Sequence, residues 1–98
     1  MEPNFKLKIS ADADRDLAAL YEYGLMQWGE EQADRYFDAL LTHLEQLCKN
    51  PLLYAAVDYI RPGYRRSVCG SHSIYYRVVA DYVEVMAIIG KRDITARL

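Results

Sequence analysis

Six basic residues in the second half of the chain are the strongest candidates for chemistry or binding. They are Arg61, Arg65, Arg66, Arg77, Lys91 and Arg92. Guanidinium and ammonium groups can bind the carboxylates of an acidic protein, and they can stabilise the negative charge that develops when RNA is cleaved. They can also be ordinary solvent-facing charges of an antiparallel sheet. The residue types alone leave all three interpretations open.

The charges are unevenly distributed between the two halves of the chain. Residues 1–50 contain ten acidic and five basic residues, whereas residues 51–98 contain four acidic and seven basic residues. The halves therefore carry net charges of −5 and +3, which give the −2 of the whole chain. We expect the basic half to face an anionic partner. Because dedicated nucleic-acid binders are more basic, we predict no direct sequence-specific binding of nucleic acid.

The sequence offers little support for other kinds of site. No glycine-rich loop precedes a helix pattern, and no cluster has metal-ligand spacing, so we predict no cofactor and no metal. Ser71, His72 and Ser73 are adjacent on a strand pattern and should alternate between its faces, so they form no catalytic relay by themselves. Cys69 could meet His72 across a hairpin, but nothing nearby predicts an activated thiol.

Two further residue types fit structural roles better than chemical ones. Cys48 and Cys69 are far apart and lack CxxC spacing, which favours free core thiols in a reducing compartment over a disulfide. His43 lies between the apolar and polar faces of its helix pattern. We interpret it as a surface or boundary histidine and not as a ligand, because no acid or cysteine is placed to complete a metal site.

These residues must be positioned by elements that the periodicity predicts. "FKLKIS", residues 5–10, alternates and indicates a half-buried strand near a sheet edge. Ser10 can cap a first helix, which is expected to end at Gly29. A second helix is expected to begin with the acids that follow and to end at Asn50-Pro51. The apolar stripe of the first helix is expected to be Ala13, Leu17, Leu20, Tyr21, Leu25 and Trp28. The short link predicts an antiparallel helical hairpin.

Three strand patterns follow a connector that turns at Pro62-Gly63. They span residues 64–69, 72–79 and 82–89, and the dipeptides "GS" and "AD" separate them. The predicted order is β-α-α-β-β-β: a single α+β domain, residues 1–98, with a helical hairpin packed on a small antiparallel sheet. With 52% apolar residues the chain can bury a core, and no apolar run approaches the length of a membrane span. The N-terminus lacks a signal-peptide core, so we predict a cytoplasmic protein with no membrane partner.

Two motifs carry a resemblance to a known family. "WG-EQA-RY" joins the two helices, and "IRPGYRR" is followed by "GSH-I-YRV". Together with the terminal stretch they resemble the ParE branch of the RelE/ParE toxin superfamily over nearly the whole chain. The resemblance implies a bacterial type II toxin that inhibits or poisons DNA gyrase by binding, without catalytic residues. It also implies a ParD-like antitoxin, and a homodimer or a toxin–antitoxin hetero-oligomer.

The RelE branch of the same superfamily, which cuts messenger RNA on the ribosome, supplies an alternative. Arg92 matches the arginine that this branch carries after its last strand, and Arg66 matches one of its basic sheet positions. Ser73 stands where the resemblance predicts a central arginine, and Leu98 stands where it predicts a tyrosine. Because two members of that constellation are missing, the ribonuclease ranks second. A non-toxic homologue that only binds an antitoxin is the third hypothesis.

Overall fold

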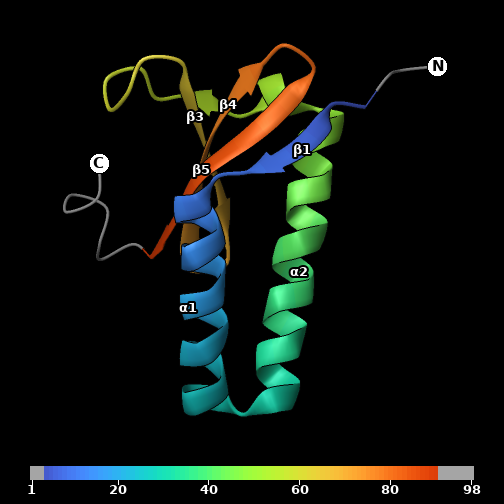
Figure 1. The fold of residues 1–98 in the computed structure, drawn as a ribbon, viewed down its shortest axis with the longest axis vertical. Coiled ribbons are helices and arrows are strands. Elements are labelled where there is room, and N and C mark those ends of the chain that lie inside the picture. Colours follow the sequence, from blue (N-terminus) through green and yellow to red (C-terminus); the bar gives the residue numbers. More distant parts are fainter. Residues whose placement is uncertain (1–3, 91–98) are drawn as a thin grey trace.

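The computed structural model describes residues 4–90 and contains two long helices and a five-stranded sheet (Figure 1). The elements are β1 (Lys6–Ile9), α1 (Ala11–Trp28), α2 (Glu30–Lys49), a 3₁₀ turn η1 (Pro51–Leu53), β2 (Ala55–Ala56), β3 (Tyr64–Cys69), β4 (His72–Val79) and β5 (Tyr82–Gly90). The helices form an antiparallel hairpin that covers one face of the sheet, so the α+β class and the order of the main elements are confirmed. Lys91, Arg92 and Leu98 lie outside the described residues.

The sheet is mixed, which corrects the expected antiparallel arrangement. The strand order is β1-β5-β4-β3-β2, and β3, β4 and β5 form the predicted antiparallel meander. β1, however, pairs with β5 in parallel, with Leu7 opposite Val83 and Ile9 opposite Val85. Alternation along a strand reveals its two faces but neither its partner nor its direction. β2 was not predicted, because two alanines carry almost no strand signal.

The predicted ends of both helices are confirmed. The Ser10 hydroxyl accepts a hydrogen bond from the backbone N–H of Ala13 at 3.0 Å. Gly29 ends α1 at φ +89°, a conformation that few side chains tolerate, and α2 begins directly after it. Asn50 ends α2, and Pro51 opens the 3₁₀ turn that follows.

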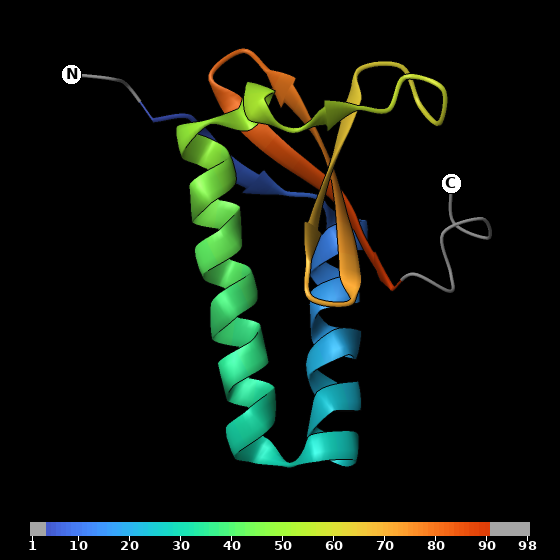
Figure 2. The ribbon, with the colours of Figure 1, turned by 180° about the vertical axis from the view of Figure 1, so that it is seen from behind.

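The main core lies between the helical hairpin and the sheet. Its fully buried members include Leu40, Leu44 and Leu47 of α2, which pack with residues of α1, β4 and β5. The apolar stripe predicted for α1 is only partly buried: Leu25 is 37% exposed and Trp28 is 46% exposed. The reason is that the hairpin extends well past the end of the sheet, as Figures 1 and 2 show, so its last turns have no sheet to cover.

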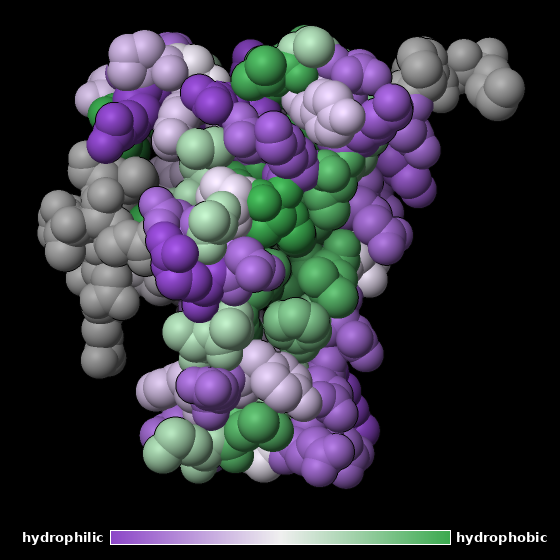
Figure 3. Space-filling model, in the orientation of Figure 1, coloured by the Kyte–Doolittle hydropathy of each residue, from purple (hydrophilic) through white to green (hydrophobic). Residues whose placement is uncertain are grey.

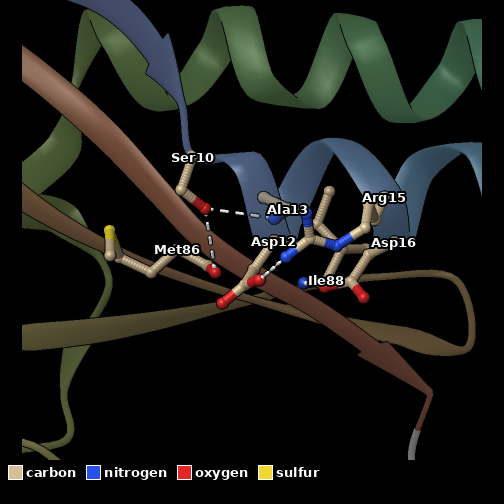
Figure 4. A network of polar contacts seen from close by, with 7 residues as sticks. All are labelled: Ser10, Asp12, Ala13, Arg15, Asp16, Met86 and Ile88. Atoms are coloured by element: carbon tan, nitrogen blue, oxygen red, sulfur yellow. Dashed lines mark hydrogen bonds and ion pairs between the residues drawn. The ribbon is translucent and has the colours of Figure 1, made fainter.

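Where β1 ends, two side chains at the start of α1, the cap residue Ser10 and Asp16, form hydrogen bonds with the edge of β5 (Figure 4). Among the described residues, no strand pairs with β5 on that side beyond Val85. The Ser10 hydroxyl donates to the carbonyl of Met86 at 3.2 Å, and the Asp16 carboxylate accepts from the N–H of Ile88 at 3.0 Å. α1 therefore satisfies backbone groups that would otherwise form an open sheet edge.

The β3–β4 turn is anchored to α2 by Tyr36. The Tyr36 hydroxyl lies 2.7 Å from Nδ1 of His72 and accepts from the N–H of Ser71 at 3.2 Å. Gly70 has φ +59°, and a Cβ at this position would lie 2.7 Å from the Tyr36 oxygen. The "GS" turn thus requires glycine both for its backbone conformation and for the close approach of the helix.

Candidate binding surface

The sheet face that points away from the helices carries two of the predicted basic residues. We call this the outer face. Alternation and strand register place Arg66 of β3 and Arg77 of β4 on it, since residues directly opposite each other share a face. Arg66 pairs with Tyr75 in the register, and Arg77 lies two residues further along β4. The structure therefore brings Arg66 and Arg77 to the same surface.

Both outer-face arginines are engaged by neighbouring side chains. Nε of Arg66 donates to the Ser73 hydroxyl at 3.0 Å, and Ser73 is 1% exposed. Nε of Arg77 donates to the carboxylate of Glu84 at 2.8 Å. Each guanidinium still has further N–H donors with which to meet an anionic partner.

The other predicted basic residues are placed differently. Arg65 lies on the helix side of β3, where its Nη1 donates to the carbonyl of Tyr54 at 2.6 Å. This contact ties β3 to the segment after η1, so Arg65 has a structural role that sequence reasoning missed. Arg61 is exposed at the Pro62-Gly63 turn. Lys91 and Arg92 lie outside the described residues, so their part in the surface stays a prediction.

A small apolar cluster underlies the outer face. Val57, Tyr75, Ala87 and Ile89 are buried there, and Ile60 and Tyr64 pack against them. The connector folds over this face, because the N–H of Val57 donates to the carbonyl of Tyr64 at 2.8 Å and holds the loop closed. The connector thus already covers this apolar cluster, so the arginines are the groups that the outer face offers to a partner.

Two adjacent buried tyrosines on β4 allow a matched test of how much a buried hydroxyl contributes to stability. Tyr75 and Tyr76 are both fully buried, but the Tyr76 hydroxyl donates to the carbonyl of Pro51 at 2.5 Å, whereas the Tyr75 hydroxyl has no hydrogen-bond partner among residues 4–90. We expect Tyr75→Phe to raise the free energy of unfolding by up to about 1 kcal/mol, and Tyr76→Phe to lower it by about 1–2 kcal/mol. Urea unfolding of both variants checks this, and equal losses would contradict it.

The titratable groups on the helix side do not form a reactive site. His43 Nε2 lies 2.5 Å from the Ser67 hydroxyl, but Ser67 is 2% exposed and out of reach of a substrate. Cys69 is directly opposite His72 in the hairpin, as expected, yet burial raises the pKa of the Cys69 thiol and so disfavours the thiolate. Both cysteines are free, as predicted.

Histidine burial gives the fold a defined pH dependence. Burial lowers the pKa of His43 below its ordinary value of about 6.5. As the pH falls through about 6.5, the unfolded chain binds a proton that the folded chain does not, so stability falls. We expect the urea midpoint to drop between pH 7.5 and pH 5.5, and His43→Gln to reduce that drop.

The matched control for this pH dependence is His72→Gln. Burial also lowers the pKa of His72, and the charge of Asp16 opposes that shift, so His72→Gln shows whether the second histidine contributes to the same drop. A pH dependence that is unchanged in His43→Gln would show that His43 is not the group responsible.

Neither a metal site nor a membrane span is present in the part of the chain that the structure describes. Within residues 4–90, no group of three or more histidine, cysteine or acidic residues could hold a metal ion. Over the same residues, no helix is long and apolar enough to cross a membrane.

Comparison with known proteins finds sequence relatives along almost the whole chain. A family model described as "ParE toxin of type II toxin-antitoxin system, parDE" matches residues 7–95. A Toxin ParE1 of Mycobacterium tuberculosis (strain ATCC 25618 / H37Rv) is 32% identical over 85 residues, which cover 86% of this chain and 87% of that protein. A Toxin ParE1 of Caulobacter vibrioides is 35% identical over 71 residues, which cover 72% of this chain and 74% of that protein.

Solved structures with the same fold are also found. One from P. aeruginosa, described as a chromosomal ParDE TA system, has a TM-score of 0.78 and 22% identity, and the match covers 88% of this chain and 95% of that chain. The toxin-antitoxin complex RelBE2 of Mycobacterium tuberculosis gives a TM-score of 0.71 at 16% identity, and the match covers 91% of this chain and 100% of that chain. At these identities the two structures confirm the fold, a helical hairpin on a small sheet.

Proposed function

This chain belongs to the ParE toxin family of type II toxin–antitoxin systems, and on that premise we propose that it inhibits DNA gyrase by binding and is neutralised by a ParD-like antitoxin. The family match carries the proposal, and it agrees with the resemblance found in the sequence motifs. The proposed site of action is the bacterial cytoplasm. There the chain forms a hetero-oligomer with its antitoxin.

A binding mechanism without catalysis is supported by the state of the outer face. A ribonuclease needs free cationic groups and an acid–base pair around the scissile phosphate. Here the charge of Arg77 is paired with Glu84, and Ser73 and Leu98 stand where the ribonuclease set has an arginine and a tyrosine. The Tyr75 hydroxyl is buried. These features favour a surface that binds a partner protein, and they disfavour a catalytic site that converts a substrate.

In the proposed antitoxin contact, the tail wraps around the toxin, with apolar anchors between the two helices and with arginines on and beside the outer face. Figure 3 shows hydrophobic side chains at the surface along the line between α1 and α2. Tyr21 and Phe37 meet edge to face between the helices, with ring centroids 5.3 Å apart, and both are half-buried. An antitoxin tail that folds onto the toxin would bury such groups and pair its acids with Arg61, Arg66 and Arg77. These arginines would then set the rate of association and its salt dependence.

The direct test is supercoiling by purified gyrase with and without this protein. We expect inhibition or a trapped cleavage complex, and release of that inhibition when the protein encoded by the neighbouring gene is added. No effect at stoichiometric excess would contradict gyrase as the target. Tight binding of the neighbouring gene product, without growth arrest on expression alone, would instead support the non-toxic homologue.

A second candidate is the ribosome-dependent mRNA interferase. Arg66 lies on the outer face, and Arg92 matches the arginine of the RelE branch in sequence. This hypothesis predicts cuts in ribosome-bound transcripts after induction, which primer extension would map. It also predicts that Arg92→Ala abolishes toxicity, whereas under the gyrase hypothesis the same change weakens toxicity only in part.

A further inference from the structure

The tip of the helical hairpin, residues 22–31, exposes large apolar side chains beyond the end of the sheet. Met26 is 85% exposed, Tyr23 is 60% exposed and Trp28 is 46% exposed. The last buried residue of α1 is Gly24, and the first of α2 is Ala33, so the tip extends beyond the core. Figures 1 and 2 show the tip at the far end of the molecule from the β3–β4–β5 meander. Exposed aromatic residues and methionine are typical of interface centres.

The tip is held in one shape by close packing. The rings of Tyr23 and Trp28 meet edge to face at 6.3 Å, and those of Trp28 and Tyr36 meet at 5.7 Å. A Cβ on Gly24 would lie 3.3 Å both from Ala33 and from the Trp28 ring, so glycine lets the indole pack across the helix pair. Trp28 is therefore fixed before any partner arrives, which lowers the entropic cost of binding.

The charge of the tip specifies the kind of partner that fits it. Residues 22–31 contain three acids, Glu22, Glu30 and Glu31, and no base. The nearest arginine, Arg35, already pairs with Glu31 at 2.8 Å. Glu22 lies one turn before Met26, so a carboxylate flanks the most exposed apolar side chain. An apolar patch with an acidic border is complementary to a basic protein surface with an apolar pocket.

We propose that the hairpin tip is the target-contacting surface of this toxin, with Met26, Tyr23 and Trp28 as anchors and a basic, DNA-binding protein surface as the partner. The proposal rests on the proposed function, since the toxin's target is an enzyme that handles DNA. Proteins that hold DNA carry basic surfaces that neutralise phosphates, and such a surface attracts the acids of the tip.

The two ends of the molecule then serve different partners. The outer face presents Arg66 and Arg77 and suits an acidic antitoxin tail, whereas the acidic tip would repel that tail. A partner at the tip would contact Tyr23, Met26 and Trp28, whereas the antitoxin would contact the Tyr21–Phe37 pair and the outer face, so the two use different side chains. Changes at the tip should therefore weaken toxicity while leaving antitoxin binding within about twofold of the wild type.

The test uses a double variant, Glu22→Lys with Met26→Ser, at solvent-exposed positions that should leave the fold intact. We expect at least about tenfold weaker inhibition of gyrase supercoiling and a matching loss of growth arrest, since truncation of a hot-spot residue weakens binding by about thirtyfold or more. The control is Leu53→Ser, 76% exposed in η1, which should keep full potency. Antitoxin affinity and the circular dichroism spectrum are measured for both.

The possible outcomes distinguish the tip proposal from the proposal that gyrase is the target. Wild-type potency in the double variant overturns the tip proposal while leaving the gyrase proposal intact. If the wild type arrests growth without any effect on gyrase, gyrase is not the target. The tip proposal is then tested by growth arrest alone, and equal arrest by the wild type and the double variant overturns it. A wild-type chain that neither arrests growth nor inhibits gyrase overturns both proposals. Equal loss of antitoxin binding and toxicity overturns the separation of the two surfaces.

Discussion

Leu44→Ala is expected to lower the free energy of unfolding by about 3–5 kcal/mol. The Leu44 side chain is 0% exposed and lies in the core between α2 and the sheet. Shortening it removes apolar contacts and leaves a cavity, because a close-packed core relaxes only in part. A domain of this length has a total stability of about 5–15 kcal/mol, so the change would remove a large fraction of it.

Urea unfolding measures this effect against a matched control. Leu53→Ala removes the same atoms from a side chain that is 76% exposed, and its cost should stay below about 0.5 kcal/mol. Equal midpoints for Leu44→Ala and Leu53→Ala would contradict the position of the core. Because an antitoxin that binds only the folded state adds about 2.7 kcal/mol at a hundredfold excess over Kd, its presence should restore much of the loss in Leu44→Ala.

Local signals explain why the helices could be predicted from the sequence. Ser10 caps α1, Gly29 ends it, and Asn50-Pro51 ends α2, and each residue acts through its own backbone conformation or hydrogen bond. Strand pairing depends on contacts between distant parts of the chain. The parallel pairing of β1 with β5 therefore could not be derived from alternation, and neither could the edge contacts that Ser10 and Asp16 make with β5.

The candidate surface could be predicted only as a set of residue types. Alternation separates Arg65 from Arg66, but the carbonyl of Tyr54 that fixes Arg65 lies eleven residues away in the chain. Helical periodicity put Trp28 on the inward stripe, which is correct for its contact with Tyr36. It could not reveal that the sheet ends before the hairpin does, and this is why the tip is exposed.

Ser73 offers the sharpest separation between the gyrase and ribonuclease hypotheses. The RelE branch resembled in sequence has an arginine where this chain has Ser73. Ser73 is 1% exposed, and its hydroxyl accepts from Nε of Arg66 at 3.0 Å. An arginine at position 73 would place a second guanidinium against the first one, with little water to screen either charge. The surroundings of Ser73 are therefore built for a small hydroxyl.

Ser73→Arg is accordingly expected to cost about 3–5 kcal/mol of stability, the range for an uncompensated buried charge, and to create no ribonuclease. The matched control is Val68→Arg. Val68 is directly opposite Ser73 in the β3–β4 register but is 48% exposed, so an arginine there can reach water at a cost below about 1 kcal/mol. Thermal unfolding of both variants and primer extension on ribosome-bound message provide the measurements. If Ser73→Arg folded as well as Val68→Arg and cut message, the outer face would be a nuclease site lacking one residue, and the mRNA interferase hypothesis would displace gyrase inhibition.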